Sequence, residues 1–166
     1  MEWPLSIDHL CRKHGEKVSH VLRCKDADAT ERVIEHVEGP FTKILVKHST
    51  APCIKAAILK ILPALRRGEP ITAADLSTEF GLHEAIEEQE TLGWNNYLLG
   101  RWSPKWQKVQ AQYFASISSQ KTSRRWATAI IHQFYMNAWD MWQYRNDRLH
   151  GPAGPLVLDE HRQLNL

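Results

Sequence analysis

Two cysteines and two histidines near the N-terminus have a spacing that suits a zinc site. They are Cys11, His14, His20 and Cys24, in the pattern C-x2-H-x5-H-x3-C. A structural zinc ion is bound by four Cys or His side chains in a tetrahedron. The two-residue gap lets one turn bring Cys11 and His14 together, and Gly15, directly after them, favours that turn. The second pair would share one face of a helix. The pattern predicts one structural zinc, and the alternative is four unrelated residues in a chain with nine histidines.

A second group of polar residues lies near the end of the longest predicted helix. Arg145, Asn146 and His150 follow a run rich in Trp. Arg is always charged and suits a phosphate group, and His transfers protons near neutral pH. On an ideal helix, however, Arg145 and His150 point about 140° apart. The alternative is a core helix whose Arg and Asn bond to a neighbouring carbonyl, carboxylate or helix end.

Basic and aromatic residues alternate in the second half of the chain, as in proteins that stack bases and hold phosphates. The cations predicted to bind nucleic acid are Arg101, Lys105, Lys108, Arg124 and Arg125. The accompanying aromatic residues are Trp94, Trp102, Trp106, Tyr113 and Trp126. The alternative is that these aromatics form the core, as Trp at helical spacing commonly does.

Charge changes sign along the chain. Residues 41–70 carry six Lys or Arg and one Glu, residues 71–100 carry six acidic residues and no Lys or Arg, and residues 101–150 carry eight Lys or Arg and two Asp. Either a basic face binds nucleic acid, or oppositely charged helices pack together and neutralise each other. The net charge of +2 favours the second interpretation.

Composition limits the class of protein. With 166 residues, 43% hydrophobic, the chain is long enough for one domain with its own core. No uncharged stretch is long enough to cross a bilayer, and residues 1–10 do not resemble a secretory signal. Three cysteines do not form a disulfide framework. We therefore expect no membrane partner and an intracellular location, either nuclear or cytoplasmic.

Helical periodicity dominates the chain, and period-two alternation is weak. Cap residues, prolines and glycines mark the boundaries. The first predicted helix begins at Asp28, is interrupted at Gly39-Pro40 and continues over 41–47. The second runs from Pro52 to Gly68, with a kink or early end at Pro63, and the third runs from Thr72 to near Gly81. The remaining helices are predicted over 83–92, over 94–99, from Pro104, and over 124–149. In the last helix we expect a buried stripe of Trp126, Ile130, Phe134, Ala138 and Trp142.

These patterns predict an all-α fold, a bundle of five to seven helices. Residues 1–25 form a zinc knuckle or irregular segment in this prediction, residues 26–151 the helical domain, and residues 152–166 a flexible tail. The fold leaves the ligand open, because helical bundles serve many functions.

Three blocks resemble, in the same order, reverse-transcriptase-like proteins of non-LTR retroelements, especially those of algae and diatoms. Residues 16–24 resemble the second half of their zinc knuckle, and residues 93–101 and 126–151 resemble the helical region that follows. The family has Cys where this chain has His14, and the chain contains no polymerase segment. The resemblance implies a non-enzymatic, retroelement-derived domain that binds RNA, DNA or a protein partner.

A second resemblance gives an enzymatic alternative. Arg145, Asn146 and His150 match the R-x4-H signature of HEPN-domain ribonucleases, which are also helical bundles. That resemblance implies a homodimer with a composite cleft between protomers. In such a cleft RNA is cleaved without metal, with its 2′-OH as the nucleophile.

Overall fold

The computed structural model describes residues 30–31, 38–71, 76 and 78–150, with side chains up to Arg148 in the last helix. The described part contains six α-helices, a short 3-10 helix and no strand, which confirms the all-α prediction. The helices are α3 (Gly39–Lys47), α4 (Pro52–Arg67), η3 (Glu79–Gly81), α5 (Leu82–Leu92), α6 (Trp94–Leu98), α7 (Pro104–Ser116) and α8 (Ser123–His150). The predicted N-terminal segment and C-terminal tail lie outside the described residues.

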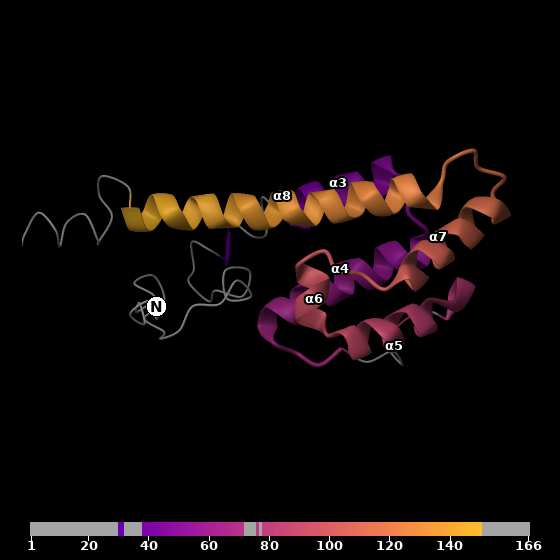
Figure 1. The fold of residues 1–166 in the computed structure, drawn as a ribbon, viewed down its shortest axis with the longest axis horizontal. Coiled ribbons are helices and arrows are strands. Elements are labelled where there is room, and N and C mark those ends of the chain that lie inside the picture. The colour runs from indigo at the N-terminus through magenta and orange to yellow at the C-terminus, as the bar shows by residue number, and fades with distance from the viewer. Residues whose placement is uncertain (1–29, 32–37, 72–75, 77, 151–166) are drawn as a thin grey trace, which may run out of the picture.

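The helices form a bundle in which α3 and α8 lie side by side along one edge (Figure 1). Helix α5 lies at the opposite edge, and α4 and α7 pack between the two edges. Helix α8 is much the longest, and its C-terminal part extends beyond the other described helices (Figure 1). One end of α8 is therefore packed into the bundle, and the other end has fewer described neighbours.

Local signals explain most helix boundaries. The Ser103 hydroxyl caps α7 by accepting a hydrogen bond from the Lys105 backbone N–H at 3.1 Å, and Pro104 occupies the first turn. Pro52 similarly opens α4, and Gly68 ends it in a left-handed conformation with φ of 75°. The predicted final helix is confirmed to within one residue at each end, since α8 covers Ser123–His150.

Pro63 does not end α4, contrary to one of the predicted outcomes. The helix runs through it to Arg67. Proline removes one backbone hydrogen bond and crowds the preceding turn. The buried stripe on α4, which includes Ile58, Ile61 and Leu65, offsets that cost by anchoring both sides of the proline in the core.

Two other predicted boundaries are changed or only partly described. Gly39 and Pro40 are the first residues of α3, so here the pair begins a helix. Most of the helix predicted from Thr72 lies outside the described residues. Its expected end at Gly81 coincides with η3, in which Phe80 has a positive φ of 53°.

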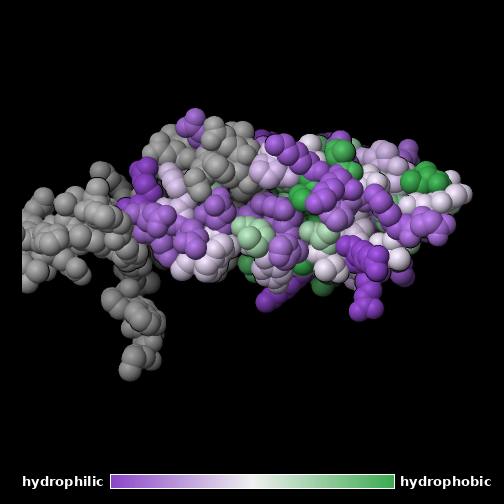
Figure 2. All heavy atoms as spheres, turned by 90° about the horizontal axis from the view of Figure 1, so that it is seen from above, coloured by the Kyte–Doolittle hydropathy of each residue, from purple (hydrophilic) through white to green (hydrophobic). Residues whose placement is uncertain are grey.

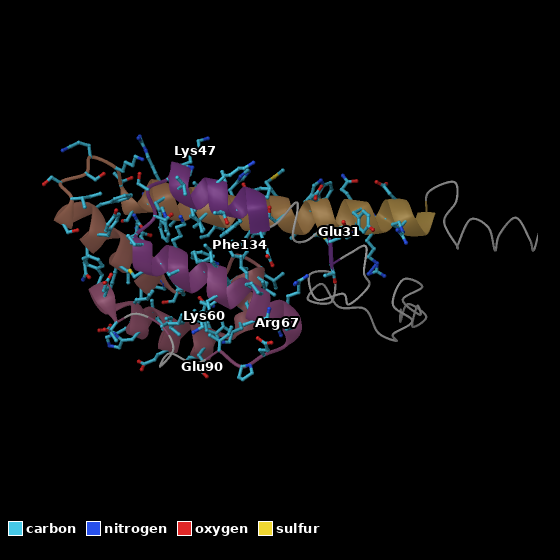
Figure 3. The ribbon with its side chains drawn as sticks, turned by 180° about the vertical axis from the view of Figure 1, so that it is seen from behind. Glu31, Lys47, Lys60, Arg67, Glu90 and Phe134 are labelled. Carbon is cyan, nitrogen blue, oxygen red and sulfur yellow. The ribbon has the colours of Figure 1, made fainter. Side chains whose placement is uncertain are left out.

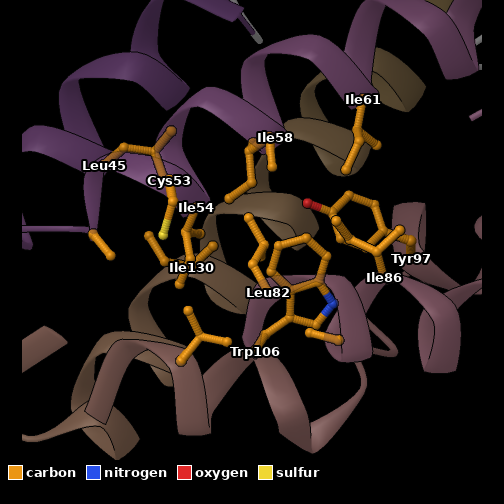
Figure 4. Close-up of a cluster of buried hydrophobic side chains, with 14 of the residues drawn as sticks. Leu45, Cys53, Ile54, Ile58, Ile61, Leu82, Ile86, Tyr97, Trp106 and Ile130 are labelled. Carbon is orange, nitrogen blue, oxygen red and sulfur yellow. The ribbon is translucent and has the colours of Figure 1, made fainter. Parts of the chain in front are cut away.

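The core is made by residues from every α-helix of the described part, and Figure 4 shows its centre. Trp106 of α7 and Tyr97 of α6 pack against Ile58 and Ile61 of α4 and Ile86 of α5. The Tyr97 hydroxyl is fully buried, points toward α4, and has no hydrogen-bond partner. Burial therefore raises the pKa of Tyr97 well above its ordinary value.

Candidate anion-binding site

The site begins at the turn between α3 and α4, whose backbone closes α3. Ser49 adopts the left-handed conformation, with φ of 51°. Its N–H bonds to the Val46 carbonyl at 2.9 Å, and the Thr50 N–H bonds to the Leu45 carbonyl at 3.0 Å. This is a Schellman motif with serine at the position that glycine usually occupies. A residue with a β-carbon is strained there, so other contacts must hold the turn.

Two buried side chains hold this turn against the rest of the bundle. Gln110 of α7 accepts a hydrogen bond from the Ala51 N–H at 2.9 Å and donates one to the Ser49 carbonyl at 3.0 Å. The indole N–H of Trp126 in α8 donates to the Thr50 hydroxyl at 2.8 Å. These bonds join segments about 60 to 76 residues apart in sequence. They fix the end of α3 beside the start of α8.

A pocket of about 660 Å³ lies between these two helix ends. It is lined by basic, polar and small residues, with no carboxylate: Ile44, Lys47, His48, Thr122, Arg124, Arg125, Thr128, Ala129, His132 and Gln133. Lys47 marks the α3 side of this region in Figure 3. The N-terminus of α8 adds the positive end of a helix dipole. We call this feature the basic pocket.

Positive charge in the basic pocket is not cancelled by nearby acids. No ion pair of the described residues involves Lys47, Arg124 or Arg125. Lys121 lies beside the pocket, where its ammonium group donates to the Ser49 hydroxyl at 2.7 Å. The pKa of His48 is lowered, first by burial and then by the charges of Lys47 and Lys121. An anion would relieve this repulsion, so the pocket suits a phosphate or other polyanion.

The structure divides the five cations predicted to bind nucleic acid. Arg124 and Arg125 line the basic pocket. Lys105 instead lies 3.5 Å from Glu84 and 3.6 Å from Glu88 on α5, which matches the alternative of neutralising helices. Arg101 donates to the Asn96 side chain at 3.2 Å. Lys108 is exposed on α7 and does not line the pocket.

Sequence reasoning missed Lys47, His48, Lys121 and His132 as members of this site. Residues 41–70 and 101–150 both carry an excess of basic residues, so these two segments repel each other unless acidic residues or a bound anion lie between them. This excess did not indicate which cations meet. Their proximity depends on the hydrogen bonds of Gln110 and Trp126 to the α3–α4 turn.

Most of the predicted aromatic set belongs to the core. Trp106 and Trp126 are almost fully buried, and the ring of Trp102 stacks on Tyr97 with centroids 4.6 Å apart. Phe134 contacts this aromatic group from α8, where it lies between α8 and α4 (Figure 3). These rings are not available to stack on bases, so the core interpretation is confirmed for them.

The predicted buried stripe on α8 is correct at its start and wrong at its end. Trp126, Ile130 and Phe134 are buried, Ala138 is half-buried, but Trp142 is 45% exposed. Four successive steps of four residues turn a straight helix by about 160°, so Trp142 faces away from the side that buries Trp126. The buried side continues instead through Asn137, Met141 and Arg145.

The residues of the enzymatic alternative all fall on regular helix. Arg145 is only 8% exposed, and Asn146 is half-buried. Helix α8 continues to His150, whose side chain is not described, so the backbone retains the rotation that separates Arg145 from His150. Burial of Arg145 is what the core interpretation expected. The ribonuclease alternative has no specific observation in its favour and stays a prediction.

The predicted zinc ligands Cys11, His14, His20 and Cys24 lie outside the described residues, so the zinc site stays a prediction. Among the residues that the structure describes, no group of three or more His, Cys, Asp or Glu is placed to hold a metal ion. Cys53 is buried in the core. Burial raises the pKa of its thiol, which makes it a poor nucleophile at neutral pH.

Within the described ranges, no helix combines the length and apolar character needed to span a bilayer. No protein-family model, curated protein or solved structure matches the chain.

Proposed function

We propose that this chain is a non-enzymatic helical module that binds nucleic acid through the basic pocket. The observation that carries the proposal is the pocket itself, where Lys47, Arg124 and Arg125 meet two histidines and no carboxylate. Three exposed cations that lie close together and have no acidic partner attract an anion more strongly than one cation does. A phosphate backbone supplies such anions at regular intervals.

The construction of the pocket also supports binding. Gln110 and Trp126 hold the α3–α4 turn in place through buried hydrogen bonds, so the pocket is formed before any ligand arrives. A preformed site loses less conformational entropy when it binds. Figure 2 shows mainly hydrophilic residues on the side of the molecule where α3 and α8 lie, and eight of the ten residues that line the pocket are polar or charged. This composition suits a polyanion better than an apolar protein surface.

Fluorescence anisotropy with labelled RNA and DNA tests the proposal. Three phosphate contacts, one for each permanent cation of the pocket, predict a log–log salt slope of roughly −2 for a single strand. Arg125→Glu should weaken binding severalfold or more because it replaces an attraction with a repulsion. Lys108→Glu makes the same change of charge on α7, outside the pocket, and should have a much smaller effect.

Both residues are exposed, so the variants should unfold within about 0.5 kcal/mol of the parent protein. Circular dichroism melting verifies this. Two results would contradict a role for the pocket. One is an affinity that does not change with salt concentration, and the other is an equal loss of affinity in Arg125→Glu and Lys108→Glu. Absence of binding to every oligonucleotide at about 50 mM salt would contradict the proposed function itself.

The origin and location of the protein remain proposals that rest on sequence alone. The three ordered blocks support a retroelement-derived domain, and nucleic-acid binding is consistent with that origin. The sparse cysteines support a nuclear or cytoplasmic location. A protein partner is the alternative ligand of the pocket. The titrations would favour a protein partner if neither RNA nor DNA bound.

A further inference from the structure

Helix α8 exposes aromatic rings and buries polar side chains in its second half. Tyr135 is 59% exposed and Trp139 is 54% exposed, and Trp142 is exposed to a similar extent. Another face of the same helix buries Met141 together with the polar residues Asn137 and Arg145. Burying the aromatic face instead would remove more apolar surface from water. An exposed aromatic face opposite buried polar residues therefore indicates a binding surface.

The exposed rings form one ordered strip. Tyr135, Trp139 and Trp142 are spaced by four and three residues, which places them on one side of the helix. The indole rings of Trp139 and Trp142 stack, with centroids 5.0 Å apart and planes 29° apart. Two of the three rings therefore form one continuous aromatic surface, and Tyr135 lies one turn before it on the same side. We call it the aromatic strip.

The aromatic strip continues from the basic pocket along the same helix. Arg124, Arg125, Thr128 and His132 line the pocket and are exposed. At 100° per residue, these positions and Tyr135, Trp139 and Trp142 lie within about 100° of arc on one side of α8. One continuous face thus carries cations at its N-terminal end and aromatic rings toward its C-terminal end.

We propose that this face binds a single-stranded nucleic acid, with phosphates in the basic pocket and bases stacked on Tyr135, Trp139 and Trp142. The inference rests on the proposed function and adds the strand class and the base-binding residues. Cations without carboxylate partners complement the phosphates, and aromatic planes complement unpaired bases. A duplex keeps its bases stacked on each other and could use only the cationic end.

The spacing of the two ends sets the length of strand. Arg125 and Trp142 are seventeen residues apart, which is about 26 Å along a helix. At about 3.4 Å per nucleotide, a stacked strand of roughly eight nucleotides covers that distance. Affinity should therefore rise steeply between about four and eight nucleotides and only slightly beyond that.

Anisotropy titrations with matched ligands and variants test the inference. The ligands are fluorescein-labelled RNA and DNA single strands of about four, eight and twelve nucleotides, a blunt duplex, and an eight-unit abasic strand that keeps the phosphates. The variants are Trp139→Ala, Trp139→Phe and Trp142→Ala. Leu92→Ala, at an exposed apolar position on α5, is the control.

Trp139→Ala should weaken binding of the eight-nucleotide strand roughly five- to a hundredfold. Trp139→Phe should retain most of the affinity because it keeps an aromatic plane, and Leu92→Ala should change little. The abasic strand should bind the parent protein more weakly than Trp139→Ala binds the normal strand, because it loses stacking on all three rings. Its binding should not weaken further in Trp139→Ala, because it has no bases to stack.

Several outcomes would overturn the inference without touching the proposed function. One is salt-dependent binding that Arg125→Glu weakens but Trp139→Ala and Trp142→Ala do not. Another is equal affinity for duplex, abasic and normal strands. Sedimentation gives a third, since a dimer that Trp139→Ala dissociates would mean that a second copy of this chain covers the aromatic strip. Failure of every strand to bind would instead refute the proposed function.

Discussion

Gln110→Leu is the substitution that best tests how the basic pocket is built. Leucine fills a similar volume but can neither donate nor accept a hydrogen bond. The Ala51 N–H, which is fully buried, loses its partner, and so does the partly accessible Ser49 carbonyl. The change therefore removes the polar support of the α3–α4 turn while it leaves the apolar packing of α7 almost unchanged.

The expected cost follows from the burial of the two abandoned groups. A buried unsatisfied backbone group costs about 1–3 kcal/mol. Water can reach the Ser49 carbonyl more easily than the Ala51 N–H, so the two costs do not add fully. We expect the free energy of unfolding to fall by about 2–4 kcal/mol, with a decrease in Tm of roughly 4–16 °C.

Urea unfolding followed by Trp fluorescence measures this change. Gln112→Leu, at an exposed position on the same helix, is the matched control and should stay within about 0.5 kcal/mol of the parent protein. Since the turn carries His48 into the pocket, Gln110→Leu should also weaken nucleic-acid binding at temperatures where it is folded. If Gln110→Leu were as stable as Gln112→Leu, the turn would not depend on these bonds, and the account of the pocket would be wrong.

Three further predictions concern single side chains. Trp126→Ala should destabilise the fold by about 3–5 kcal/mol because the ring is buried, whereas Trp142→Ala should cost less than about 1 kcal/mol; equal effects in thermal melts would contradict the burial pattern. Tyr97→Phe should be neutral or stabilising by up to about 1 kcal/mol, because it removes a buried hydroxyl without a partner. A clear decrease in the free energy of unfolding in urea would show that the hydroxyl does make a hydrogen bond. The lowered pKa of His48 means that the folded state disfavours its protonated form, so stability should decline as pH falls below 6.5; His48→Gln should lose less stability between about pH 7.5 and 5.5, and an unchanged decline would contradict this.

The helices themselves could be predicted from the sequence because their signals are local. Ser103 followed by Pro104 specifies the start of α7 through a hydrogen bond that spans two residues. Gly68 specifies the end of α4 because it adopts a left-handed conformation at little cost. Periodic apolar positions specify the face of α4 that is buried. Each signal acts within a few residues, so the rest of the fold is not needed to interpret it.

The basic part of the site could be predicted only in outline. Residue types indicated phosphate binding and included Arg124 and Arg125, which do line the pocket. The sequence did not show that Lys105 faces acidic residues of α5 while Lys47 faces the start of α8. Coulomb interactions depend on distance in space, and that distance is set by packing between segments far apart in the chain.

Only the tertiary structure decided which aromatic residues of α8 are buried and which are exposed. Trp126 and Trp142 are similar in type, and both fit a helical pattern, yet one is in the core and the other is exposed. Periodicity shows which residues share a face, but it does not show which face the neighbouring segments cover. Burial requires atoms on the other side. Such atoms cover the side of α8 that carries Trp126, Ile130, Phe134 and Met141, and they leave the side of Trp142 exposed.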